Sequence, residues 1–326
     1  MPWELRWHPF RGEWVLFTSH RGQRPWIGET AAPVEPVAAS DNALAPGGKR
    51  IAATNPDYRG VYVFTNDLPV FAPDAPEPGR ADDLYRTRRA SGTAEVICYH
   101  HDPARSLADL TDDEVEAVVT TWRERTEALQ RLDDVAHVLI FENRGSLVGT
   151  SNPHPHCQVY AGPLVYATMA REAEVAREHH ARTGRDILDD VVQREERGGR
   201  VVSEGEHFFA CVPWFAQFAY EVLILPRRQA ASLVDLDAER SRSLGLVLRD
   251  VVRRYDALWG FRMPYVLAVH QAPVGEVLYP FHLELHPPLR APGLLKYLAG
   301  PEVGGGTITN ESDPDEKAGE LRAALG

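Results

Sequence analysis

The chain has 326 residues, 44% of them hydrophobic and 25% charged, a composition typical of a globular protein with one large domain or two ordinary ones. Its formal net charge of -12 argues against nucleic acid as a partner, because that affinity depends on clustered lysine and arginine. We expect neither a membrane span nor a secretory signal, and three scattered cysteines fit a reducing cytoplasm better than a disulfide framework.

The first half of the chain contains a loop, a helix and a strand that follow from local patterns. Residues 27–46 are rich in alanine and proline without periodicity and indicate a loop. Thr111 followed by Glu114 is a capping-box signature, and apolar residues continue at helical spacing from Val115 to Leu129. An apolar run at 135–141 then predicts a strand.

The next segment carries side chains capable of chemistry. In the run Asn152-Pro153-His154-Pro155-His156-Cys157-Gln158, the alternation of a strand would place His154, His156 and Gln158 on one face. A neutral imidazole whose second nitrogen is held by another group is a competent nucleophile, and a glutamine amide can donate to an oxygen that gains negative charge. A buried polar strand or half of a metal site is the alternative interpretation of this motif taken alone.

The second half repeats the pattern of the first at a constant offset. Glu95-Val96-Ile97 recurs as Glu221-Val222-Leu223, and Ser106-Leu107-Ala108-Asp109-Leu110 recurs as Ser232-Leu233-Val234-Asp235-Leu236. A second helix pattern follows Asp237, and strands are predicted at 265–269 and 282–286. Between the copies, dense charges at 165–197 indicate one or two exposed helices. We therefore predict an α+β fold of two pseudo-repeated units, each an antiparallel sheet with packed helices.

Several further motifs accompany the histidines. They are Arg21-Gly22-Gln23-Arg24-Pro25-Trp26, Asn55-Pro56-Asp57-Tyr58, Tyr62-Val63-Phe64-Thr65-Asn66-Asp67, Phe141-Glu142-Asn143-Arg144-Gly145, Gly149-Thr150-Ser151-Asn152-Pro153, Pro213-Trp214 and the stretch from His270 to Pro288. Together with the His-Pro-His run, they resemble the galactose-1-phosphate uridylyltransferases, the transferase branch of the histidine-triad superfamily. The hydrolase branches carry a third histidine where this chain has Gln158.

The resemblance implies a nucleotidyltransferase that exchanges a uridylyl group between UDP-glucose and galactose 1-phosphate by ping-pong kinetics. It implies a covalent uridylyl-histidine intermediate on His156, which His154 orients directly or through its backbone carbonyl. The same resemblance assigns Ser151, Asn143 and Gln158 to the phosphoryl oxygens, and we count Ser151 and Gln158 with the catalytic residues. The remaining implied substrate contacts are Arg21 and Arg24 at the diphosphate, Phe64 and Asn66 at the uracil and ribose, and Lys296, Tyr297 and Glu302 at the hexose, the last three from a neighbouring subunit.

Without the resemblance, each of these residues also has a structural interpretation. Asn143 and Ser151 lie in sequences that form turns, the two arginines could be solvated on a loop, and Phe64 could belong to the core. The chain also departs from the family near the sugar, where Pro301 stands in place of an expected tyrosine.

Two metal sites known in the family are unequally represented. The first is expected to be lost, because Asn42, Ala45 and Pro103 stand where ligands would be and only His154 remains, whereas a closed zinc site needs about four ligands. No catalytic metal and no organic cofactor is expected, since arginine and amide donors can offset phosphoryl charge.

The second metal site is matched by four residues, Glu172, His270, His282 and Glu284. Two imidazoles and two carboxylates could hold one structural zinc or iron ion. A hydrogen-bonded polar network without metal is the alternative for the same four side chains.

The resemblance further implies an assembly and a division of the chain. It predicts a cytoplasmic homodimer whose active sites are shared across the interface, with a UDP-sugar and a hexose 1-phosphate as its small-molecule partners and no membrane or nucleic acid. Residues 1–160 would form a histidine-triad-like half with the active-site motif, and residues 161–326 a half with a degenerate motif and a substrate-contacting tail. The alternatives are a related nucleotidyltransferase or sugar-nucleotide phosphorylase with another base or sugar, a histidine-triad hydrolase, and a non-catalytic nucleotide binder.

Overall fold

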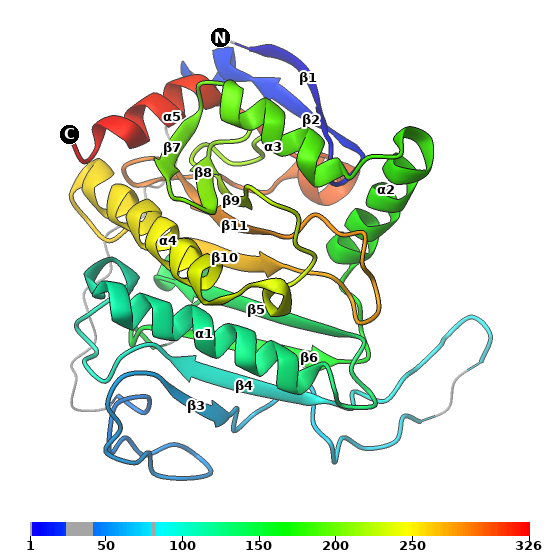
Figure 1. The fold of residues 1–326 in the computed structure, drawn as a ribbon, viewed down its shortest axis with the longest axis vertical. Helices are drawn as coiled ribbons and strands as arrows, with labels where there is room; N and C mark the ends of the chain where they lie inside the picture. The colour runs from blue at the N-terminus through cyan, green and yellow to red at the C-terminus, as the bar shows by residue number, and fades with distance from the viewer. Residues whose placement is uncertain (1, 24–41, 80–81, 151) are drawn as a thin grey trace.

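A nine-stranded antiparallel sheet forms the centre of the molecule in the computed structural model, which describes residues 2–23, 42–79, 82–150 and 152–326 (Figure 1). Its strands, in spatial order, are β3 (Tyr62–Thr65), β4 (Thr93–Cys98), β6 (His156–Gly162), β5 (His137–Arg144), β10 (Tyr265–His270), β11 (His282–His286), β9 (Val222–Pro226), β8 (Phe208–Cys211) and β7 (Val201–Glu204). The sequence suggested two sheets, but β5 pairs with β10 and joins them into one. This pairing satisfies the backbone groups of two strands that would otherwise be exposed edges.

Two long helices lie side by side across one face of this sheet (Figure 1). They are α1 (Asp112–Leu129) and α4 (Ala238–Trp259). The predicted capping box is confirmed, since Thr111 accepts from the backbone N–H of Glu114 and the Glu114 carboxylate accepts from that of Thr111. α1 buries Val115, Val118 and Trp122 in the main core, against residues of the central strands.

The described ranges contain three shorter α-helices besides α1 and α4. They are α2 (Ala167–Thr183), α3 (Ile187–Arg197) and α5 (Pro314–Ala323). The charged segment at 165–197 is helical as predicted, but α3 also buries an apolar side against Phe209 and Leu223. α3 therefore covers the C-terminal half of the sheet on the face opposite α4. No helix in the described ranges is both long and apolar enough to span a membrane.

The N-terminal segment packs on the far half of the chain. β1 (Trp3–His8) and β2 (Glu13–Thr18) form a hairpin, and β14 (Thr309–Asn310) adds to β2 in parallel. The Ser19 hydroxyl donates to the Ser312 carbonyl over 2.7 Å, and Arg6 Nη1 donates to the Trp214 carbonyl over 2.8 Å. Between β11 and β14 in the sequence, β12 (Leu289–Ala291) and β13 (Leu294–Leu295) form a separate two-stranded hairpin.

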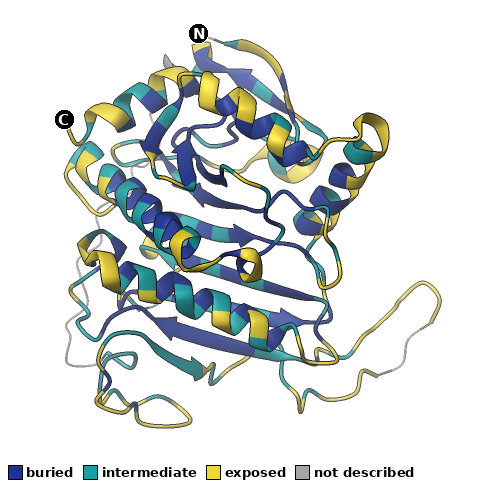
Figure 2. Ribbon diagram, viewed as in Figure 1, coloured by how far each residue is buried: buried dark blue, intermediate teal, exposed yellow. Residues whose placement is uncertain are grey.

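The N-terminal half of the sheet has one well-covered face and one less covered face. Ile97, Ile140 and Val159 belong to the main core beneath α1, and Figure 2 shows the central strands buried between more exposed outer segments. The opposite face carries a small apolar cluster that includes Tyr58 and Val96. Residues that alternate with the core positions of β4, β6 and β5 point to this second face, and the candidate active site lies there.

Candidate active site

His156 opens β6, and its imidazole is held in the orientation that a nucleophile needs. Nδ1 lies 2.7 Å from the backbone carbonyl oxygen of His154 and must donate, because a carbonyl oxygen only accepts. The proton is thereby fixed on Nδ1, and Nε2 keeps its lone pair. Burial lowers the pKa of His156 below its usual 6.5, against the opposing effect of this hydrogen bond. The ring is therefore neutral at physiological pH.

His154 precedes the strand, which corrects the expectation that three polar side chains alternate along it. β6 begins at His156, and Pro153 and Pro155 both lack the N–H that a strand ladder uses. The side chain of His154 is buried among other partners, and the contact with His156 comes from its backbone carbonyl. Of the two ways in which His154 was expected to orient the nucleophile, the geometry supports the one through the carbonyl.

The ring of His154 has a hydrogen-bond partner for each nitrogen. Nε2 donates to the His100 carbonyl over 2.8 Å and lies 2.9 Å from the Tyr58 hydroxyl. Nδ1 then carries the lone pair and accepts from the Asn42 amide over 3.1 Å. Burial lowers the pKa of His154 to about 4, so the ring stays neutral within this network.

Asn42 also ties together two loops that flank His156. Its Oδ1 accepts from the Asn152 amide and from the Leu44 N–H, each over 3.0 Å, while Asn152 Oδ1 accepts from the His154 N–H over 2.9 Å. From the sequence, Asn42 was noted only because it stands where a metal ligand was expected, and Tyr58 only because it belongs to a motif. No local pattern could have indicated their contact with His154, because 112 residues separate Asn42 from it.

Three of the predicted substrate-binding residues share a sheet face with His156. Gln158 lies two residues along β6 from His156, and the register pairs Gln158 with Val96 and Val96 with Phe64. Cross-strand partners project to the same side, so Phe64 belongs to this face. Asn66 follows two residues later, and its amide lies 3.5 Å from Gln158 Oε1. The second donor to Gln158 Oε1 is the Tyr160 hydroxyl at 3.2 Å. Among the described residues, the Gln158 amide hydrogens remain for an incoming oxygen.

Asn143 joins the same face from the neighbouring strand. Register pairs Phe141 of β5 with Gln158, and Asn143 lies two residues further along β5. The backbone carbonyl of Asn143 accepts from the Thr150 hydroxyl, which holds the loop that leads back to His156. Ser151, the remaining predicted phosphoryl contact in this loop, lies outside the described residues, as does Arg24.

An arginine that sequence analysis missed covers part of the Phe64 ring. The guanidinium carbon of Arg50 lies 3.9 Å from the ring centroid, within cation–π distance. Arg50 is anchored by an ion pair with Asp67 and by a 2.7 Å bond to the Asn55 amide oxygen. Phe64 is only half-buried, so a flat ligand at this position would lie beside a cation.

The remaining predicted contacts form a second, separate group. Lys296 Nζ donates to the Thr309 carbonyl and lies 3.6 Å from Glu302, while Arg21 forms an ion pair with Glu311 at 3.7 Å. Tyr297 is exposed and follows Lys296 directly. Thr309 belongs to β14 beside β2, at the end of the molecule opposite β3 (Figure 1). Within the described ranges the structure therefore does not bring these residues to His156 of the same chain.

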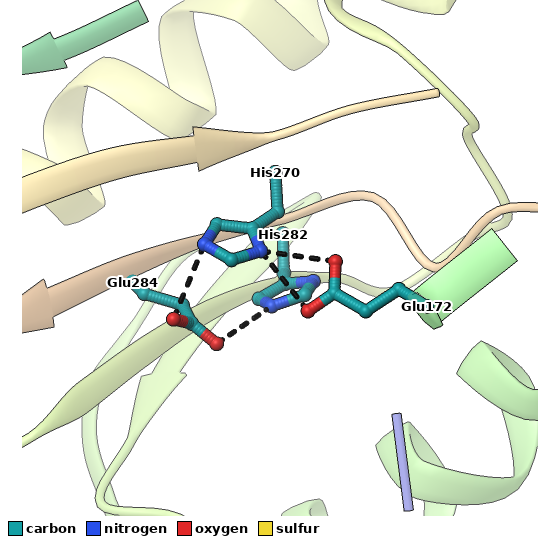
Figure 3. Close-up of side chains that lie close together, drawn as sticks. All are labelled: Glu172, His270, His282 and Glu284. Atoms are coloured by element: carbon teal, nitrogen blue, oxygen red, sulfur yellow. Dashed lines mark hydrogen bonds and ion pairs between the residues drawn. The ribbon is translucent and has the colours of Figure 1, made fainter. Parts of the chain in front are cut away.

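A cluster of four buried residues lies between α2 and the C-terminal half of the sheet (Figure 3). His270 Nδ1 is 3.0 Å from Glu172 Oε2, and His270 Nε2 is 3.2 Å from Glu284 Oε2. His282 donates from Nδ1 to the Pro280 carbonyl and directs Nε2 at Glu284 Oε1, 3.1 Å away. The sequence prediction that these four residues meet is confirmed.

The donor set of this cluster fits a divalent metal ion. One ligand atom from each residue lies within 4.8 Å of the others, and two imidazoles with two carboxylates suit zinc or iron. A histidine whose other nitrogen donates to a backbone carbonyl, as in His282, is typical of metal ligands. Among the described residues this is the one such convergence of histidine, cysteine and carboxylate groups.

Comparison with known proteins identifies the family. A model of the galactose-1-phosphate uridyl transferase N-terminal domain matches residues 3–165, and a model of the C-terminal domain matches residues 172–319. The galactose-1-phosphate uridylyltransferase of Haemophilus influenzae is 36% identical over 98% of this chain and 93% of its own length. The chain belongs to the galactose-1-phosphate uridylyltransferase family.

Solved structures agree with this assignment. One described as a uridylyltransferase superimposes with a TM-score of 0.82 at 28% identity, covering 99% of this chain and 98% of its own. An ADP-glucose phosphorylase from Arabidopsis thaliana superimposes with a TM-score of 0.78 at 21% identity, over 98% of this chain and 97% of its own. The second likeness shows a shared fold.

Proposed function

We propose that the protein exchanges a uridylyl group between UDP-glucose and galactose 1-phosphate through a covalent intermediate on His156. The observation that carries this proposal is the fixed tautomer of His156, whose Nδ1–H is bound by the His154 carbonyl at 2.7 Å. The free Nε2 lies on the same face as the amide of Gln158. Membership in the family supplies the nucleotide and the sugar.

The reaction consists of two displacements at one phosphorus atom. Nε2 of His156 attacks the α-phosphorus of UDP-glucose, the bond to the bridging oxygen breaks, and glucose 1-phosphate departs with that electron pair. The cationic imidazole is stabilised by the Nδ1–H bond to the His154 carbonyl. A phosphate oxygen of galactose 1-phosphate then attacks the same phosphorus and Nε2 leaves, which gives UDP-galactose. In both steps, amide hydrogens of Gln158 and Asn143 would offset the charge on the non-bridging oxygens.

We further propose a homodimer in which each subunit completes the active site of the other. The separation of the Lys296, Glu302 and Arg21 group from His156 supports a site that is incomplete within one chain. The outer face of the N-terminal hairpin also exposes large apolar side chains, Trp3, Leu5, Trp7 and Trp14, and such patches are typical of interfaces. The compartment that fits these substrates and three unpaired, buried cysteines is the cytoplasm.

The two halves, 1–160 and 161–326, are proposed to be histidine-triad-like units related by duplication. The strand order supports this, because β4-β6-β5 is followed by β10-β11-β9, each set beneath one long helix. The repeated Ser-Leu-x-Asp-Leu segments support it too, since both form a short 3-10 turn with the same capping box. For the buried cluster of Glu172, His270, His282 and Glu284, we propose at most one zinc or iron ion, whose role where it is bound is structural and not catalytic.

A labelling experiment tests the proposed reaction. The protein is incubated with UDP-glucose labelled in the uracil ring and then denatured, and the label that remains on the polypeptide is counted. We expect stoichiometric labelling that galactose 1-phosphate discharges as UDP-galactose, and no labelling of His156→Ala. Release of free UMP without a labelled protein would identify a hydrolase, and no turnover would identify a nucleotide binder.

A sugar-nucleotide phosphorylase is the second candidate. The fold shared with an ADP-glucose phosphorylase and the replacement of an expected tyrosine by Pro301 favour considering it. The same assay with labelled ADP-glucose, and with inorganic phosphate as the acceptor, separates the two candidates.

A further inference from the structure

Arg11 places a permanent positive charge inside the buried cluster of Glu172, His270, His282 and Glu284, defined here as the carboxylate–histidine cluster. Its side chain is only 15% exposed. Nη2 donates to Glu284 Oε2 over 2.6 Å, and Nε lies 3.7 Å from Glu172 Oε1. One guanidinium therefore reaches both carboxylates that a metal ion would need.

The loop that carries Arg11 is built to hold it there. Gly12 adopts a positive φ of 60°, and a Cβ at this position would lie 2.7 Å from Arg171 Nη2. Arg171 Nε donates to the Arg11 carbonyl over 3.1 Å, and Arg11 Nη1 donates to the Gln217 side-chain oxygen over 2.6 Å. The backbone of Arg11 is thus held by Arg171 of α2 and its guanidinium by Gln217, and its charge cannot be removed by deprotonation.

Both carboxylates also have partners outside the four residues of the cluster. Glu284 Oε2 accepts from Arg11 and from His286 Nε2, the latter over 2.9 Å. Glu172 accepts from the Tyr279 hydroxyl. A divalent ion bound to Glu284 would share a carboxylate with the guanidinium, and the two positive charges would lie roughly 5 Å apart in a buried environment.

We propose that Arg11 is the resident cation of the carboxylate–histidine cluster, so that it stabilises the buried carboxylates without metal and weakens the affinity of the cluster for a divalent ion. The cluster then acts as a structural ion network in this chain, and metal binding is optional. This inference does not depend on the proposed transfer reaction, because it concerns stability and metal affinity.

The test compares zinc affinity in the native chain and in Arg11→Met. Both proteins are stripped with a chelator, and zinc binding is measured by competition with a chromophoric chelator. We expect Arg11→Met to bind zinc about tenfold more tightly or better, because the like charge is gone. Adding His282→Gln to that variant should abolish the gain, which locates the ion in the cluster. Equal zinc affinity in the native chain and Arg11→Met would overturn the proposal.

Thermal stability supplies a second readout. Chelation should leave the melting temperature of the native chain unchanged. The metal-free Arg11→Met variant should have a lower melting temperature than the native chain, and zinc should raise it again. Arg131→Met removes the same charge from a side chain that is 73% exposed and should leave both measurements unchanged.

Arg11→Lys keeps the inference testable if the methionine variant does not fold. A lysine preserves the charge, so its zinc affinity should stay within about threefold of the native value. A lysine variant that binds zinc as tightly as predicted for methionine would overturn the role of charge. A fall in the melting temperature of the native chain on chelation would overturn the claim that metal is optional.

Discussion

At the scale of single residues, the reactivity of His156 is set by burial together with one hydrogen bond. Burial lowers its pKa below 6.5, so the neutral nucleophile predominates at pH 7. We predict that the single-turnover rate of protein labelling is flat between about pH 7 and 8.5 and falls in acid as His156 becomes protonated. A rate that climbs steeply above pH 7 would point to a different titrating group.

Asn42 does not hydrogen-bond His156 but hydrogen-bonds the His154 ring and Asn152, and the His154 carbonyl in turn holds the His156 ring. We predict that Asn42→Ala slows formation of the labelled enzyme by about tenfold or more while the KM for UDP-glucose changes by less than about threefold. The reason is that the variant loosens the carbonyl that orients the nucleophile, and leaves the nucleotide contacts in place.

Gln271→Ala is the matched control for this loss of a buried amide. Gln271 donates to the Val138 carbonyl over 2.9 Å, and Val138 lies on the core face of β5, away from His154. It should lower stability without slowing the labelling step. If both variants lose activity only in proportion to folded protein, Asn42 is structural and does not position His156.

Gln158 marks the position where hydrolase relatives carry histidine. We predict that Gln158→His raises hydrolysis of UDP-glucose relative to transfer, because an imidazole can exchange a proton with water and an amide cannot. Product analysis by chromatography, with and without galactose 1-phosphate, measures the ratio. An unchanged ratio would remove Gln158 from the choice between water and sugar phosphate.

At the scale of elements, β5 combines a catalytic face with a buried acid on its core side. Glu142 accepts from the hydroxyls of Tyr99 and Tyr265 at 3.0 and 3.1 Å. Burial raises the pKa of Glu142 to about 7, against the opposing effect of Arg144. The Glu142 carboxyl is therefore about half ionised near neutral pH. Burial of its ionised form lowers the free energy of unfolding.

This raised pKa predicts a pH-dependent stability. From pH 4.5 to pH 7 the unfolded chain loses the proton of Glu142 while the folded chain keeps it, so the free energy of unfolding falls as pH rises. Glu142→Gln lacks this contribution. We predict that the stability of the variant relative to the native chain rises by on the order of 3 kcal/mol from pH 4 to pH 8, measured by urea unfolding. Glu127→Gln, on an exposed side chain of α1, is the control and should show no such change.

The elements also show what could be predicted from sequence. Helices α1 and α4 were predicted because apolar residues follow Thr111 and Asp237 at helical spacing, and for α1 because Thr111 and Glu114 also form a capping box. The position of His154 was predicted wrongly, because alternation alone ignores that Pro153 and Pro155 delay the strand. The Arg11–Glu284 pair could not be found at all, since it joins residues 273 positions apart and no local pattern encodes such a contact.

At the scale of the whole molecule, the predicted site residues fall into two separate groups, one around His156 and one around Lys296. This separation makes the proposed homodimer with shared active sites testable. Subunits carrying His156→Ala and subunits carrying Lys296→Met should each be inactive. In a mixed dimer with sites shared across the interface, one of the two sites combines both intact residues, so the purified mixed dimer should have about half of the native activity.

Co-expression with two different affinity tags, followed by tandem purification of the mixed dimer, measures this complementation. His156→Ala combined with Lys296→Met on one subunit, paired with a native subunit, provides the comparison, since each shared site then contains one defect. Failure of the separate variants to complement would mean that both residues act within one chain or that Lys296 is not needed.

The crossing of residues 2–23 onto the far half of the chain has a consequence for biosynthesis. This hairpin is synthesised long before its partners near Trp214 and Ser312, which follow 208 and 293 residues after the residues that contact them. Until then the nascent chain carries Phe10, Val15 and Phe17, which are buried in the folded chain, without β14 or the C-terminal half to dock against. Long-range closure of this kind is slow and exposes apolar surface during synthesis. Docking of the hairpin is therefore expected to be among the last steps of folding, once Ser312 has been synthesised.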